Sequence, residues 1–206
     1  ADLTPDGQIL IVTQLVQSTG ATDTEEILFI PLTNPSAFQT CRGLRETAIR
    51  LRDTVFHFDS RSEFAYAILP YGLNRDDTGV LRVNFRDRNN IMCDSIGILD
   101  AAIGPGEIEA ILLSEDDRSL WVFDSRRGLA RLDVVETSTT FETYSPWVSV
   151  TTPNGTPLRA NRLFFSREPG HVWLISTNQD TALVNVANGN ILDNIFNVRR
   201  TTVSLV

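Results

Sequence analysis

The sequence predicts an all-β protein built from four similar modules, and two observations carry this prediction. First, polar turn residues separate β-prone runs: in residues 111–123, Ser-Glu-Asp-Asp-Arg-Ser stands between Ile-Leu-Leu and Leu-Trp-Val-Phe. Second, the same pattern recurs along the chain, and its turns start at Thr4, Asp59, Ser114 and Ser166. The intervals of 55, 55 and 52 residues indicate four copies of one module in a single domain that spans residues 1–206.

Each module contains four short strands. In the third module they are expected at residues 108–113, 120–123, 129–134 and 139–144. In the fourth module they are expected at residues 163–165, 172–176, 182–186 and 191–198, with a type I′ turn at Asn188-Gly189 before the last strand. Four short strands in a repeat of about 50 residues are typical of a β-propeller blade, whose faces are buried against the neighbouring blades.

The two ends of the chain suggest how the propeller closes. The first module lacks a strand before its turn, whereas residues 201–206 form one further β-prone run at the other end. Pairing of that run with residues 8–14 would complete the first blade and cover its free edge. We therefore expect a ring of four four-stranded blades, closed by N- and C-terminal strands that share a blade. A fragment of a larger propeller, or half of an eight-bladed ring shared by two chains, is the alternative.

One hairpin is similar to a known family. Residues 4–12, Thr-Pro-Asp-Gly-Gln-Ile-Leu-Ile-Val, resemble the hairpin of the YVTN/WD40-like β-propeller superfamily, which reads Ser-Pro-Asp-Gly, two residues and an apolar strand. Residues 114–122 are similar, with Asp117 where glycine is usual. The resemblance covers nearly the whole chain at the level of the repeat pattern. It implies the propeller fold but no particular activity, because this fold hosts unrelated functions.

Composition narrows the environment of the protein. Hydrophobic residues make up 42% of the chain, and the net charge of −8 disfavours binding to nucleic acid or anionic lipid. No apolar run is long enough to cross a bilayer, so membrane insertion is not expected. All 18 basic residues are arginine, and the only methionine is Met92. An Ala-Asp start without an initiator fits a cleaved leader and a secreted, periplasmic or cell-surface protein, or a piece of a longer chain.

The two cysteines, Cys41 and Cys93, follow Pro31 and Asn84 at similar distances and so hold nearly equivalent places in adjacent blades. Equivalent positions on adjacent outer strands usually lie too far apart for a disulfide, so pairing requires one cysteine to lie on a connection. One disulfide of an exported protein and two separate thiols both fit the sequence.

Acidic and amide side chains gather in the loop after the second strand of the first two modules, and such insertions should project from one face of a propeller. These candidate binding residues are Asp23, Glu25, Glu26, Asn74, Asp76 and Asp77. Their oxygens would suit Ca²⁺, but the spacing is not that of an EF-hand, so solvated turn residues are the favoured interpretation. The shared acidic face is the alternative, as a binding surface for cations or an arginine-rich partner. Trp147, beside Pro146, departs from the repeat pattern and is the best single candidate for a contact residue.

No catalytic constellation stands out in the sequence. His57 and His171 are the only histidines, and they lack the spacing of a zinc site. We therefore expect a non-enzymatic binding or scaffolding module without a resident cofactor, whose partner is another protein or a further copy of itself. The alternative is a lactonase-like hydrolase with one Ca²⁺ in the central channel, for which Asp53, Asp100 and Asn161 are candidates because they precede first strands.

Overall fold

The computed structural model describes residues 1–16, 24–41, 55–69, 79–98, 108–124, 126–134, 140–141, 146–152, 155–176 and 181–195. Within these ranges the secondary structure consists of β-strands and one 3-10 turn, which confirms the all-β prediction. No helix in the described part of the chain is long and apolar enough to cross a membrane.

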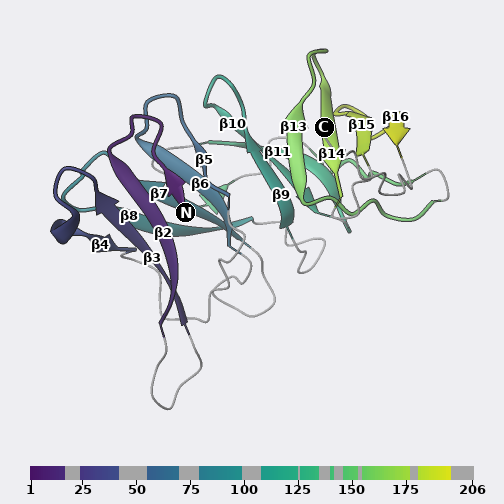
Figure 1. Cartoon of the computed structure of the whole chain (residues 1–206). Coiled ribbons are helices and arrows are strands. Elements are labelled where there is room, and N and C mark those ends of the chain that lie inside the picture. Colours follow the sequence, from purple (N-terminus) through teal and green to yellow (C-terminus); the bar gives the residue numbers. More distant parts are fainter. Residues whose placement is uncertain are drawn as a thin grey trace, which may run out of the picture.

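Blades 1 and 2 are formed by the first half of the chain (Figure 1). In blade 1 the sheet order is β1 (Asp2–Leu3), β2 (Ile9–Val16), β3 (Thr24–Pro31) and β4 (Gln39–Thr40), with the 3-10 turn η1 (Pro35–Ala37) before β4. In blade 2 the order is β5 (His57–Phe58), β6 (Phe64–Leu69), β7 (Gly79–Asn84) and β8 (Met92–Ile98). All these neighbouring strands are antiparallel.

Blades 3 and 4 are formed by the second half. Blade 3 contains β9 (Ile108–Leu113), β10 (Ser119–Asp124) and β11 (Gly128–Asp133). Blade 4 contains β13 (Arg162–Phe165), β14 (His171–Ile175), β15 (Thr181–Asn185) and β16 (Ile191–Ile195). The four antiparallel sheets confirm the prediction of propeller blades.

Two strands lie elsewhere than expected. Asp2 and Leu3 pair with Ile11 and Leu10, so blade 1 has its own innermost strand. At Leu10 and Ile11, β1 therefore occupies the edge of β2 on which the C-terminal run was expected. Residues 201–206 themselves lie outside the described residues. A strand of two residues shows no alternation of polarity, which is why the sequence pattern gave no sign of β1.

The other correction concerns the fourth strand of blade 3, which was expected at residues 139–144. Its described part, β12 (Thr140–Phe141), pairs in parallel with Gly97 and Ile98 at the edge of blade 2. At the edge of blade 3, Val148 forms an antiparallel bridge with Leu129 instead. The run therefore reaches back to the preceding blade, a non-local pairing that periodicity does not reveal.

The first turn of every blade has the same backbone hydrogen bond, from the first turn residue to the carbonyl five residues later. The four bonds are Thr4 N to Ile9 O (3.0 Å), Asp59 N to Phe64 O (3.0 Å), Ser114 N to Ser119 O (2.8 Å) and Ser166 N to His171 O (3.2 Å). In the third turn Asp117 has a φ of 59°, the left-handed conformation that Gly7 adopts in the first turn with a φ of 69°. The glycine preference of the similar family at this position therefore has a conformational cause.

Three hydrophobic cores join consecutive blades: one lies between blades 1 and 2, one between blades 2 and 3, and one between blades 3 and 4. Figure 1 shows the blades following one another from blade 1 at one end to blade 4 at the other. Among the described residues, no hydrophobic core joins blade 4 to blade 1. The described blades therefore form an arc in which each end blade has one neighbour.

A disulfide links blades 1 and 2. It joins Cys41, directly after β4, to Cys93 on β8, with the two Cα atoms 5.5 Å apart. The backbone N–H of Cys41 donates to the carbonyl of Ile27 at 3.1 Å, which holds the residue beside β3. One cysteine thus lies just beyond a strand end, as the pairing requires.

Candidate functional site

The side chains of the second and third strands of each blade alternate between two faces. We call the face that packs on the next blade the leading face, and the face that packs on the preceding blade the trailing face. On the second strands one leading position is held by Ile11 in the core between blades 1 and 2, by Tyr66 between blades 2 and 3, and by Trp121 between blades 3 and 4. The equivalent residue of blade 4 is Trp173, seven residues after the start of its turn as in the other blades.

The trailing positions of blades 2, 3 and 4 are deeply buried. Each blade contributes four apolar residues, and none of the twelve is more than 1% exposed: Ala65, Ala67, Leu81, Val83, Leu120, Val122, Ala130, Leu132, Val172, Leu174, Ala182 and Val184. Each set of four belongs to the core shared with the preceding blade. These positions therefore form the trailing half of every described junction between blades.

In blade 1 the same four positions are also apolar, but none of the other described blades packs against them. They are Leu10, Val12, Leu28 and Ile30, all of them partly exposed. Register places Leu10 between Leu3 and Ile30, and Leu3 is 49% exposed. Strands exposed on one face normally alternate between apolar and polar residues, whereas continuous apolar runs are typical of strands buried on both faces. The trailing face of blade 1 thus has the composition of a buried surface.

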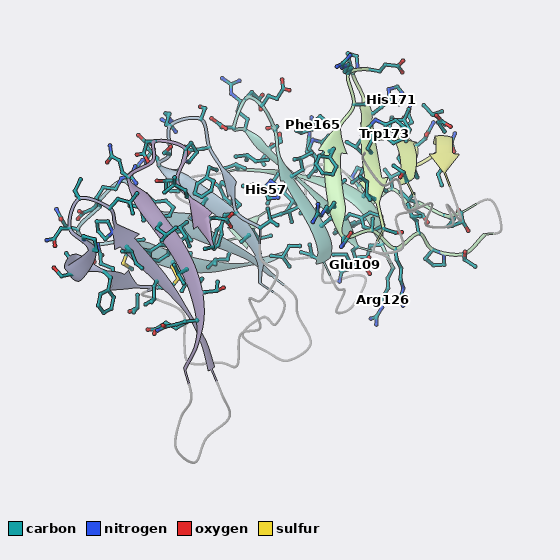
Figure 2. All side chains as sticks on the ribbon, in the orientation of Figure 1. His57, Glu109, Arg126, Phe165, His171 and Trp173 are labelled. Atoms are coloured by element: carbon teal, nitrogen blue, oxygen red, sulfur yellow. A yellow bond between two sulfur atoms is a disulfide. The ribbon has the colours of Figure 1, made fainter. Side chains whose placement is uncertain are left out.

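The leading face of blade 4 is the counterpart at the other end of the arc. Trp173 pairs with Phe164 on one side and with Leu183 on the other, so the three side chains form one row over three strands, and Asp193 follows in register on β16. Phe164 is 46% exposed, and Trp173 and Leu183 are partly exposed. Figure 2 shows Trp173 on this end blade. Trp173, Phe164 and Leu183 belong to none of the three hydrophobic cores of the described residues.

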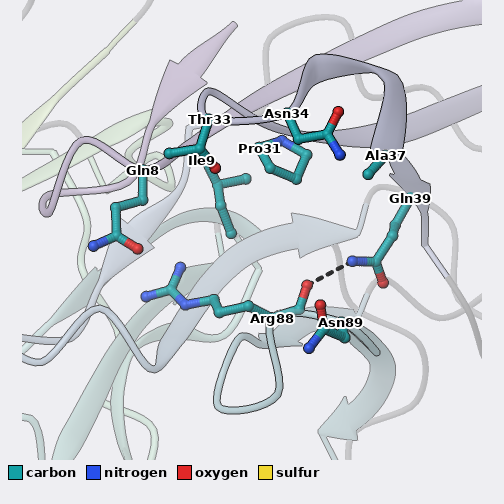
Figure 3. Close-up of a pocket in the computed structure, with 9 residues that line it drawn as sticks. All are labelled: Gln8, Ile9, Pro31, Thr33, Asn34, Ala37, Gln39, Arg88 and Asn89. Carbon is teal, nitrogen blue, oxygen red and sulfur yellow. Dashed lines mark hydrogen bonds between the residues drawn. The ribbon is translucent and has the colours of Figure 1, made fainter.

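A polar pocket of about 230 Å³ lies between blades 1 and 2 (Figure 3). Its lining is mostly amide and aliphatic: Gln8, Ile9, Pro31, Thr33, Asn34, Ala37, Gln39, Arg88 and Asn89. Gln39 Nε2 donates to the Arg88 carbonyl at 2.6 Å, and Gln39 Oε1 accepts from the Ile91 N–H at 3.0 Å. Arg88 Nη2 donates to Asp6 at 2.8 Å and to the Ser62 carbonyl at 3.0 Å. These polar groups hold the two blades together.

The innermost strands bring some titratable groups to the inner edge of the arc. Burial lowers the pKa of His57 on β5 below its ordinary value of 6.5, and the Asp2 carboxylate partly opposes this shift. Glu109 on β9 accepts a hydrogen bond from the Ala160 N–H at 3.1 Å (Figure 2). Within the described ranges, no three His, Cys, Asp or Glu residues are grouped as a metal site would need.

Of the three residues proposed for a channel cation, the structure describes one. Asp53 and Asp100 lie outside the described residues. Asn161 is exposed just before β13, and its N–H donates to the Ile175 carbonyl at 3.0 Å. The three are therefore not brought together by anything that the described residues show.

Most of the predicted acidic face also falls outside the described residues, namely Asp23, Asn74, Asp76 and Asp77. Glu25 and Glu26 lie on β3. Glu26 accepts a hydrogen bond from Gln14 Nε2 at 3.1 Å, across the β2–β3 pair. The acidic face remains a prediction.

Trp147, the predicted contact residue, is half-buried. It packs against the core between blades 2 and 3, and the Arg127 guanidinium carbon lies 5.5 Å from its ring centroid. This environment is that of a packing residue beside the Val148 bridge. The two exposed apolar end faces were not predicted. For blade 1 the sequence does contain a signal, namely the unbroken apolar runs in residues 9–12 and 27–30.

Comparison with known proteins supports the fold at this level. No family model matches the chain, and none of the curated proteins matches it. Among solved structures it is similar to the periplasmic gluconolactonase PpgL of Pseudomonas aeruginosa, with a TM-score of 0.56 and 19% identity over 94% of this chain and 52% of that one. The Cps50 (Swd1) β-propeller domain of Myceliophteria thermophila gives a TM-score of 0.56 and 14% identity over 94% of this chain and 58% of that domain.

The hydrazine synthase of Kuenenia stuttgartiensis gives a TM-score of 0.58 and 11% identity over 90% of this chain and 57% of that one. Identities this low establish a shared fold and nothing about activity. The chain is thus a set of β-propeller blades, and the resemblance to the YVTN/WD40-like superfamily is supported as far as the propeller fold. It spans a little over half the length of each of these structures.

Proposed function

We propose that this chain is a non-enzymatic binding and scaffolding β-propeller module that binds protein through the free faces of its two end blades. The observation that supports this most directly is the trailing face of blade 1. Leu10 and Val12 are apolar and partly exposed at positions that are at most 1% exposed in the other three blades. Leaving apolar area in water costs roughly 25 cal/mol per Å², so a covering partner is favoured.

We further propose that the module works outside the cytoplasm. The Cys41–Cys93 disulfide supports this location, because such bonds persist in oxidising compartments and are rare in the cytosol. The similarity to a periplasmic propeller is compatible with it. We also propose a second binding surface, for a cation or an arginine-rich partner, at the predicted acidic loops. The Asp76→Ala/Asp77→Ala variant should bind such a partner with lower affinity than the wild type, and an unchanged affinity would count against this surface.

The experiment that tests the binding role uses the immobilised chain and the extracytoplasmic fluid of the producing cell. The wild-type chain should retain protein, either further copies of itself or another protein, and Trp173→Glu should release it. Met92→Glu is the matched control, because Met92 is 38% exposed but lies on β8 of blade 2, which is not an end blade. Equal retention by all three chains, or no retention, would contradict the proposal.

A Ca²⁺-dependent lactonase-like hydrolase is the second candidate. It is supported by the titratable groups on the innermost strands, Asp2, His57 and Glu109, at the edge where a propeller channel lies. Calorimetry with Ca²⁺ and an assay of lactone opening test it directly. Absence of heat, of a thermal shift and of hydrolysis would dispose of this candidate.

A further inference from the structure

We infer that the partner on both free end faces is a second copy of this chain. The leading face of blade 4 in each copy packs on the trailing face of blade 1 in the other copy, which closes a ring of eight blades. This inference rests on the proposed binding role of those faces and names their occupant.

The first argument is the polarity of the junctions. The three described junctions are all formed by the leading face of one blade on the trailing face of the next. The two unpaired faces are one of each kind, the leading face of blade 4 and the trailing face of blade 1. Each copy therefore offers a leading face, on blade 4, and a trailing face, on blade 1, and these are the two kinds of face that form a junction. Such a heterologous contact gives a ring when the rotation between copies closes.

The described junctions are also chemically similar to the inferred junction between blade 4 of one copy and blade 1 of the other. Tyr66 shares its core with Leu120 and Val122, and Trp121 packs against the core that contains Val172 and Leu174.

In the inferred junction Trp173 meets Leu10 and Val12 of the other copy, again an aromatic ring against two aliphatic side chains. Phe164 and Leu183, which flank Trp173 in register, extend the apolar row across the sheet. The partly exposed residues of both faces thus become the interior of a junction of the same type.

The third argument is the size of the arc. Over 90–94% of its length the chain superposes on only 52–58% of three larger proteins of the same fold. Figure 1 places blades 1 and 4 at opposite ends of the arc, so the two free faces of one copy do not meet each other. Both free faces can therefore meet another molecule at the same time.

The test begins with the mass of the full chain in solution, measured by light scattering behind size exclusion. The chain has a mass of 23.0 kDa, and the inference requires a species of twice that mass, about 46 kDa, at micromolar concentration. A monomer up to 100-fold higher concentration, or a series of open assemblies of increasing mass, would overturn it.

Two variants then test which faces meet. Trp173→Glu blocks the leading face of blade 4, and Val12→Glu blocks the trailing face of blade 1; each alone disables both junctions of a pair of identical copies. Each should raise the dimer dissociation constant at least 100-fold. An equimolar mixture of the two should restore a 46 kDa species in part, because one junction then has both of its faces intact. The control Met92→Glu, on β8 of blade 2, should leave the mass unchanged.

The mixture separates this arrangement from a symmetric face-to-face dimer, in which the blocked chains do not complement one another. No recovery of mass on mixing would overturn the inference. Circular dichroism and thermal unfolding of each variant confirm that the blades are folded. If the wild-type chain is monomeric yet retains a different protein through Trp173, the second copy is excluded while the binding role stands. If it is monomeric and retains nothing, both fail.

Discussion

At the scale of single residues, Gly128 has the closest approach to a neighbouring backbone atom among the left-handed glycines that the structure describes. Its φ is 101°, and a Cβ there would overlap the carbonyl oxygen of Val148, whose N–H and C=O both bond Leu129. Gly128→Ala should therefore lower the free energy of unfolding by about 3 kcal/mol or more. Gly155 is the matched control, since its φ is 76° but no atom lies within 4 Å of its Cβ direction. Gly155→Ala should cost about 1 kcal/mol, and urea unfolding of both variants checks the difference.

His57 should make stability depend on pH. Burial lowers its pKa in the folded chain below the ordinary 6.5, with the Asp2 carboxylate opposing. Between 6.5 and the lower folded pKa, the unfolded chain binds more protons, so the free energy of unfolding falls as pH drops through this window and levels off below it. Unfolding measured at pH 7.5 and 5.5 should show a smaller difference in His57→Gln than in the wild type. An unchanged difference would assign the dependence to other groups.

At the scale of elements, the disulfide between the end of β4 and β8 fixes blade 1 to blade 2. It spans 52 residues of sequence, and closing a loop of that size in the unfolded chain is worth about 2–4 kcal/mol of stability. The Cys41→Ser/Cys93→Ser variant should have a free energy of unfolding lower by this amount, measured by urea unfolding. Reduction of the wild type should reproduce the change, and the reductant should have no effect on the variant.

Elements with clear alternation were predictable, and elements without it were not. The strand expected at residues 108–113 is β9, and the one expected at 129–134 is β11 to within a residue at each end. The two-residue strand β1 was not predicted, because so short a strand shows no alternation. The strand that contains β12 was predicted, but its pairing with the edge of blade 2 was not, because no local pattern defines it. Without β1, blade 1 was expected to take its innermost strand from the C-terminal run; with β1, it has an innermost strand from its own N-terminus.

At the scale of the whole molecule, assembly predicts that thermal stability depends on concentration. A contact that forms only between folded copies stabilises the folded state by mass action. The melting temperature of the wild type should therefore rise over a hundredfold increase in concentration, whereas that of Trp173→Glu should stay constant. Scanning calorimetry at several concentrations checks this. A wild-type melting temperature independent of concentration would contradict assembly over that range.

The candidate site could be predicted only in part, for a reason at this same scale. The unbroken apolar run in residues 9–12 shows that both faces of this strand are suited to burial, and the sequence contains that signal in full. Periodicity does not encode which body covers the second face, because that depends on packing beyond the local sequence. The predicted acidic face combines loops of two blades. Their relative positions depend on how the blades pack, which the local sequence pattern does not specify.

The unequal side chains at the junctions have a consequence for how the gene can change. Ile11 packs with Ala65 and Ala67, whereas larger rings fill the later junctions against bulkier aliphatic residues. The modules share a common turn, yet each has diverged to fit its own neighbour. Recombination that exchanged the second and third modules would create voids at one joint and overlaps at another, so the order of the modules matters for packing although their turns are alike.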